Sequence, residues 1–208
     1  LSLPRCNEDR HGRTWLRLRY PRAAVSSLCY NFAAVWIFLP AVDHQVPTGW
    51  IAPLITSSLL HAMGVASLAN WSLRNELSRL TDVSLMIVLK AHFIALAIGL
   101  ERHDRTIALW TAASFLLAVG LVFTLRLADN NQADMVVAPF IAVLLACEAF
   151  YRPPLLVEPP EGMALFIAGY LCKVADVRGV CPHFLWWTAL FHALTAYVMA
   201  LPAMVVRG

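Results

Sequence analysis

Charged side chains are scarce in this sequence, and the scarcity limits what the chain can be. Asp, Glu, Lys and Arg supply 14% of its 208 residues, 60% of the residues are hydrophobic, and the mean hydropathy is +0.65. A soluble domain carries about 25% charged residues. The chain therefore has too little polar surface to cover itself in water, and its composition favours a lipid bilayer as its solvent. The formal net charge of +3 is too small to indicate a nucleic-acid partner.

Paired cysteines and flexible linkers are also lacking. The five cysteines form no CxxC pair, and their odd number excludes a simple disulfide framework. No Gly/Ser-rich linker and no internal repeat divides the chain. We therefore expect two parts, a soluble N-terminal segment over 1–23 and a helix bundle over 24–208.

The N-terminal segment is rich in arginine and lacks the apolar core that is typical of a secretory signal. An Arg-rich start without an initiator methionine suits the processed form of an organellar protein, with the mitochondrial inner membrane as the expected location. It also suits the cytoplasmic flank of a first membrane helix.

Seven continuous apolar segments predict an all-α polytopic transmembrane bundle of about seven spans, because a span needs about 20 mostly apolar residues. The sixth is the least apolar. The segments lie at about 24–42, 50–70, 82–100, 105–127, 134–151, 162–176 and 183–205. Lys and Arg are concentrated in the N-terminal segment and in every second loop, so the positive-inside rule predicts an N-terminus on the cytoplasmic or matrix side.

Ionisable side chains inside a span are costly, so each is a functional candidate. His61, His92 and His192 each lie roughly 8 to 11 residues from the ends of their predicted spans, which predicts a similar membrane depth. Three imidazoles at one depth could hold zinc with water as the fourth ligand. Two could ligate a haem, or each could hydrogen-bond a neighbouring helix. Lys90 and Glu148 are the expected ion pair of the bundle interior.

Short motifs along the chain resemble a superfamily of seven-helix membrane proteins. Ser57 and His61 form a Ser-x-x-x-His pair, Asp82 begins the third predicted span, and FHALTAYVMALP follows in the last. The superfamily includes alkaline ceramidases, adiponectin-type receptors, myomaker relatives and GPI-anchor-remodelling lipid hydrolases. Its pattern is Ser-x-x-x-His on helix two, Asp at the start of helix three and His-x-x-x-His on helix seven. The resemblance implies that three histidines hold zinc, while the serine and the aspartate support the metal-bound water.

One ligand of that pattern is replaced. His192 matches the second histidine of the helix-seven pair, but Thr188 stands where the first is expected. His92 could supply the third zinc ligand. Ser57 and Asp82 would then orient the water that attacks a lipid amide or ester.

Several function classes stay open from the sequence. The favoured one is a non-catalytic member of this fold, or an unrelated bundle, that acts as an accessory subunit of a larger organellar membrane complex, in contact with the bilayer and with other membrane subunits. The alternative is a zinc-dependent intramembrane lipid hydrolase that uses His61, His192 and His92. A haem- or quinone-binding membrane subunit is a further alternative. The replaced ligand and the Arg-rich start favour the first class.

Overall fold

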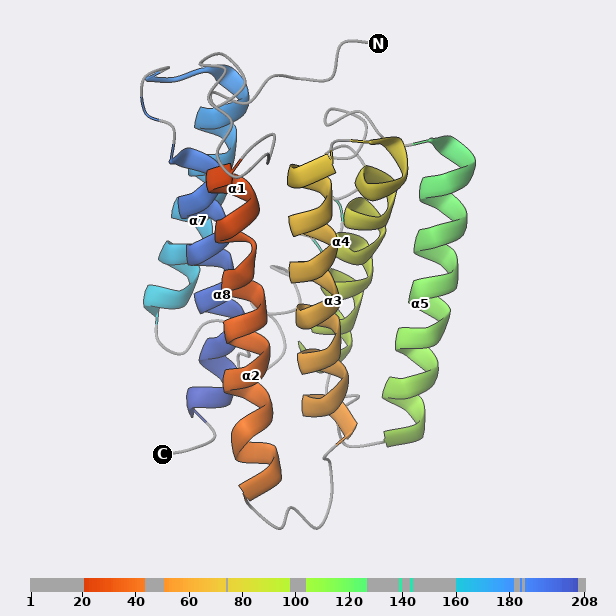
Figure 1. Ribbon diagram of the computed structural model, residues 1–208. Coiled ribbons are helices and arrows are strands. Elements are labelled where there is room, and N and C mark those ends of the chain that lie inside the picture. The colour runs from red at the N-terminus through yellow and green to blue at the C-terminus, as the bar shows by residue number, and fades with distance from the viewer. Residues whose placement is uncertain are drawn as a thin grey trace.

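The computed structural model describes residues 21–43, 51–73, 75–97, 104–126, 139, 143, 160–181, 184 and 186–205, and within these ranges every element is a helix. Figure 1 labels them. The helices are α1 (Pro21–Ser26), α2 (Leu28–Asp43), α3 (Ile51–Leu73), α4 (Glu76–Ala97), α5 (Asp104–Leu125), α7 (Pro160–Arg178) and α8 (Trp187–Val205).

The all-α class predicted from the sequence is confirmed over these ranges. Among the described helices, two are long and apolar enough to cross a membrane, over Ile51–Leu73 and Arg105–Leu125. The count of about seven spans stays a prediction. The predicted span 134–151, with Glu148, lies outside the described residues except for 139 and 143, and so do residues 1–20 of the N-terminal segment.

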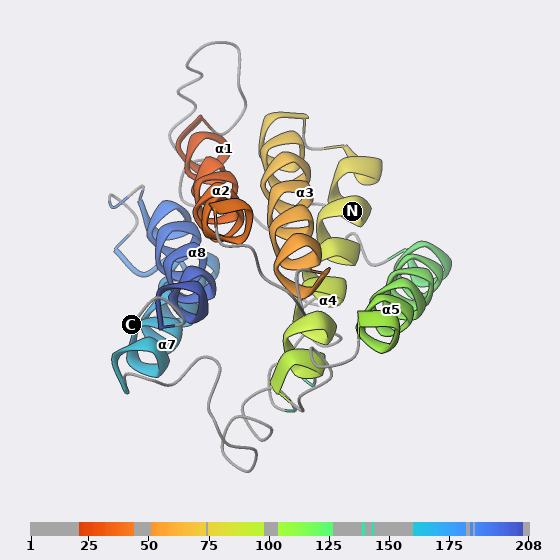
Figure 2. The same cartoon turned by 90° about the horizontal axis from the view of Figure 1, so that it is seen from below.

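The helices follow one another around an arc, seen along their axes in Figure 2. Contacts link α7 to α8, α8 to α2, α2 to α3, α3 to α4 and α4 to α5. α1 and α2 form a nearly continuous rod that is interrupted at Ser27, and α1 packs against both α3 and α8. α3 is therefore central, with contacts to α1, α2, α4 and α5.

Local sequence explains two of the helix ends. Asn75 caps α4, because its Oδ1 accepts a hydrogen bond from the backbone N–H of Ser78 at 2.7 Å. α7 ends in a Schellman motif at Gly179, whose φ of 70° favours glycine. The Val180 N–H donates to the Ala175 carbonyl at 2.9 Å, and the Gly179 N–H donates to the Asp176 carbonyl at 3.2 Å. This turn brings α8 back alongside α7.

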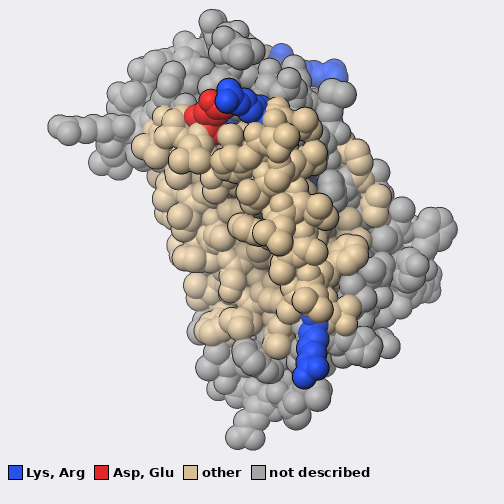
Figure 3. Space-filling view, turned by 90° about the vertical axis from the view of Figure 1, so that its right-hand side faces the viewer, with Lys and Arg blue, Asp and Glu red and all other residues tan. Residues whose placement is uncertain are grey.

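Large apolar side chains cover much of the outside, while the interior contains many polar ones. Phe32, Leu116 and Leu117 are 73%, 72% and 74% exposed, whereas Asn70 and His92 are fully buried. Figure 3 views the molecule from the α5 side, and the described charged side chains of that face lie near its two ends. A helix bundle in water would show the opposite distribution.

Candidate functional site

A cavity of about 70 Å³, here called the His192 cavity, lies among α2, α3, α4, α7 and α8. One part of its wall is polar and the other is apolar and aromatic. It is lined by Tyr30, Met63, Ser67, Trp71, Arg79, Asp82, Met86, Leu89, Lys90, Phe166, Tyr170, Lys173, Phe191, His192, Thr195 and Met199.

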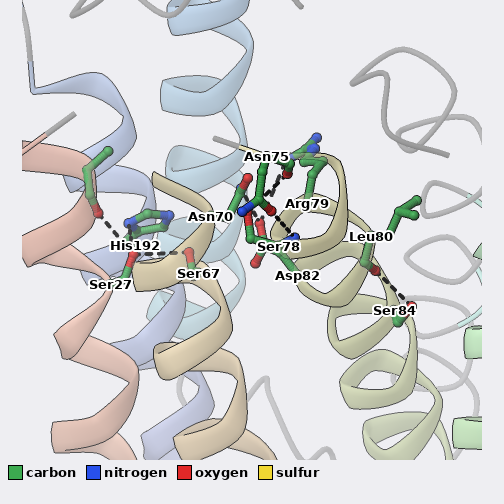
Figure 4. A network of polar contacts seen from close by, with 11 residues as sticks. Ser27, Ser67, Asn70, Asn75, Ser78, Arg79, Leu80, Asp82, Ser84 and His192 are labelled. Carbon is green, nitrogen blue, oxygen red and sulfur yellow. Dashed lines mark hydrogen bonds and ion pairs between the residues drawn. The ribbon is translucent and has the colours of Figure 1, made fainter. Parts of the chain in front are cut away.

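His192 is buried and joins α8 to the break between α1 and α2 (Figure 4). Its Nδ1 lies 2.9 Å from Ser26 Oγ and 3.5 Å from Ser27 Oγ. The Ser26 hydroxyl donates to the Ala23 carbonyl at 3.0 Å, so it accepts from His192 Nδ1–H and leaves Nε2 as an acceptor. Ser27 Oγ lies 3.0 Å from Ser67 Oγ, which extends the polar chain to α3.

Aromatic rings surround the imidazole on the other sides. The ring centroids of Tyr30, Trp71 and Phe191 lie 5.7, 6.2 and 5.6 Å from that of His192. The Lys173 ammonium lies over two of these rings, with its Nζ 5.5 Å from the Trp71 centroid and 5.9 Å from the Phe191 centroid. Such cation–π contacts hold a cation inside a largely apolar environment. The cavity thus contains a side-chain cation close to its histidine.

Asp82 forms the second polar centre of the cavity. Its Oδ2 accepts a hydrogen bond from Asn70 Nδ2 at 2.7 Å and lies 3.6 Å from Arg79 Nη1. Asp82 Oδ1 and Asn70 Oδ1 are both buried and have no hydrogen-bond partner in the described part of the chain. Figure 4 shows this group on α3 and α4, beside the His192 cluster. Of these two residues Asp82 lines the cavity, so its Oδ1 is an acceptor for a group there that can donate a hydrogen bond.

His92 lies elsewhere and bridges three helices. Its Nε2 is 2.8 Å from Thr56 Oγ1 on α3, and its Nδ1 is 3.1 Å from Thr111 Oγ1 on α5. Because Thr56 donates its hydroxyl hydrogen to the Ala52 carbonyl at 2.8 Å, it accepts from His92 Nε2–H. His92 Nδ1 then accepts from Thr111. Both ring nitrogens are engaged, so His92 acts here as a structural link.

The Ser57–His61 pair is also outside the His192 cavity. Ser57 is buried and donates to the Ala34 carbonyl on α2 at 2.8 Å, whereas His61 is exposed. Thr188 donates to Asp176 Oδ2 at 2.6 Å, and both side chains are buried between α7 and α8. Of the predicted site residues, the structure brings Asp82 and His192 to one cavity.

The similar depth predicted for the three histidines is not supported by the contacts of His92 and His192. His192 lies near Ser67, through Ser27, while His92 contacts Thr56, and these two positions on α3 are about 16 Å apart along its axis. The reason is that α4 begins at Glu76 and α8 at Trp187, which shifts both histidines toward helix ends. Within the described residues, no group of three His, Cys, Asp or Glu side chains could hold a metal ion.

Sequence reasoning did not predict Ser67, Asn70 and Trp71 on α3, or Lys173 on α7, as residues of a site. A signal was present, because positions 63, 67, 70 and 71 share one face of a helix, and this face carries Ser67, Asn70 and Trp71 of the stretch ASLANWS.

Comparison of the chain with protein-family models, with curated proteins and with solved structures finds no match.

Proposed function

We propose that this chain is a multi-pass membrane protein whose internal polar site is non-catalytic, a zinc-free relative of the ceramidase, adiponectin-receptor and myomaker superfamily. Its role would be structural, as an accessory subunit of a membrane complex. The observation that carries the proposal is the composition of the His192 cavity, which contains Asp82 and one histidine together with a tryptophan and three cationic side chains.

The outer surface supports membrane integration. On α5, Leu116 and Leu117 project outward between Arg105 and Arg126, which are both exposed. The span between the two arginines is about 31 Å at 1.5 Å per residue, and a bilayer hydrocarbon core is about 30 Å thick. In a cysteine-free background, we expect Leu116→Cys to resist a water-soluble maleimide in intact membranes and Arg105→Cys to react. Rapid labelling of Leu116→Cys in sealed membranes would argue against the span.

The cavity also supports a different register for the superfamily pattern. Ser67 and Trp71 are four residues apart, and both line the His192 cavity with Asp82, whereas Ser57 and His61 do not. In this register Ser67 is the serine of the pattern, and Trp71 stands at the first histidine.

Two of the three ligand positions then carry residues that cannot bind zinc. Trp71 replaces one histidine, Thr188 replaces another and donates to Asp176, and His192 is left as a single imidazole. A catalytic zinc site needs three protein ligands and an open position for water. The metal-bound water that would attack a lipid amide or ester therefore has no support in this cavity.

Metal analysis with restored ligands tests the proposal. We expect purified wild-type protein to contain no stoichiometric zinc, and the double variant Trp71→His with Thr188→His to gain zinc that is lost again on adding His192→Ala. The single variant Trp71→Phe is the matched control and should gain none. Stoichiometric zinc in the wild type, lost in His61→Ala, would instead support a hydrolase built on the predicted ligand set.

The accessory role has its own test. After extraction in a mild detergent, we expect the tagged chain to migrate on native gels with a larger membrane assembly. Migration as a lone chain that hydrolyses lipid amides or esters would overturn this role.

A further inference from the structure

The His192 cavity is amphipathic and small. Its apolar wall contains Met63, Met86, Phe166 and Met199. Its volume of about 70 Å³ holds several groups of water size, each of which needs about 10–15 Å³. A complete lipid is too large for it. A lipid headgroup would fit, with the acyl chain following the apolar side chains toward the bilayer.

The charges on the wall favour an anion. Arg79, Lys90 and Lys173 line the cavity, whereas Asp82 is the one carboxylate among its lining residues in the described part of the chain. Two of these cations come from different helices. Lys90 on α4 places its Nζ 3.4 Å from the Met86 carbonyl, and Lys173 on α7 lies over aromatic rings. The formal charge of these lining side chains is therefore positive by two.

A phosphate monoester matches this charge better than a carboxylate, because it carries about −1.5 to −2 near pH 7. An acceptor oxygen on the wall adds a second requirement. Asp82 Oδ1 is buried without a partner in the described residues and would repel an anion that brings no hydrogen. A ligand with a hydroxyl group next to its phosphate satisfies both sides of the cavity.

We propose that the His192 cavity binds the headgroup of a hydroxyl-bearing phosphate monoester lipid, with Lys90 and Lys173 facing the phosphate and Asp82 Oδ1 accepting from the hydroxyl. The inference rests on the proposed function, because it requires a cavity that lies within the membrane and whose positive charges are lysine and arginine side chains rather than a zinc ion. The non-catalytic site would then bind lipids that carry both a phosphate monoester and a hydroxyl group.

Binding of 1-oleoyl lysophosphatidic acid to the full chain in nonionic detergent tests the inference. This probe carries both a phosphate monoester and a free hydroxyl. We expect it to bind at least tenfold more tightly than 1-oleoyl lysophosphatidylcholine, oleate or inorganic phosphate. Equal binding of lysophosphatidylcholine or oleate would overturn the phosphate monoester, and equal competition by inorganic phosphate would overturn the lipid.

Charge variants locate the site. Lys173→Gln and Lys90→Gln should each weaken binding about tenfold or more, and Lys173→Arg should retain it. Arg178→Gln, an exposed position at the end of the same helix, is the matched control and should bind like the wild type. Unchanged affinity in the Lys173→Gln and Lys90→Gln double variant, with helicity intact by circular dichroism, would overturn the inference. Binding that disappears with a chelator would instead overturn the zinc-free site of the proposed function.

Discussion

Replacing His92 by leucine tests whether this histidine is a structural link between helices. The substitution removes the hydrogen bonds to Thr56 and Thr111, which measure 2.8 and 3.1 Å, while leucine fills much of the same space. Hydrogen bonds between membrane helices average about 0.6 kcal/mol and reach about 1.7. The loss of two should therefore lower the free energy of unfolding by about 1–3 kcal/mol. At about 1.2 kcal/mol, the unfolding equilibrium constant rises roughly eightfold.

The measurement is an equilibrium unfolding titration in lipid bicelles. His61→Leu is the matched control, because His61 is exposed and should leave the midpoint nearly unchanged. A double-mutant cycle with Thr56→Val should give a coupling energy of about 0.6 kcal/mol. If His92 bound zinc, the destabilisation caused by His92→Leu would disappear when a chelator is added. If His92 is a structural link, the destabilisation should be the same with and without the chelator. The reasoning fails if His92→Leu is as harmless as His61→Leu.

Two further pairs of substitutions probe the packing of α2 against α3 and the Thr188 contact. Gly64→Ala should destabilise the fold by about 1–3 kcal/mol, because a Cβ there would approach Asn31 Cγ to 2.8 Å. Gly120→Ala, with nothing within 4 Å, should be neutral or stabilising in the same thermal unfolding assay, and equal effects would refute the close approach of α2 and α3. Thr188→Val removes the hydroxyl that donates to Asp176 and should lower the free energy of unfolding by about 1–3 kcal/mol. The loss should be smaller in the Asp176→Asn background, and thermal melting of the single and double variants measures both.

Much of the helical framework could be predicted from apolar run length. The predicted segments 50–70 and 105–127 correspond to α3 and α5, because both are long, mostly apolar runs that are followed by an arginine. The segment 82–100 differs, since α4 starts at Glu76. Its first turns are polar, so hydropathy missed them, while the Asn75 cap and the charge of Glu76 favour a helix there.

The site was harder to predict because a spacing motif does not say which face of a helix points inward. Ser57 and His61 satisfy Ser-x-x-x-His, yet Ser57 contacts α2 and His61 is exposed. Asp82 could be predicted, since a carboxylate at the start of an apolar helix must find a partner. Its partner Asn70 lies on another helix, and packing between helices decides that contact.

The position of each serine along α3 determines which of them lies at the level of His192. Ser57 precedes Ser67 by ten residues, which is about 15 Å along the helix axis and a rotation of roughly 80° about it. His192 contacts Ser27, and Ser27 contacts Ser67, so the level of His192 on α3 is fixed by a chain of hydrogen bonds. A serine displaced by that distance cannot support a water bound at His192. A water bound at His192 would therefore have to be supported by the residues that line the cavity, which include a tryptophan and a lysine ammonium beside this single imidazole.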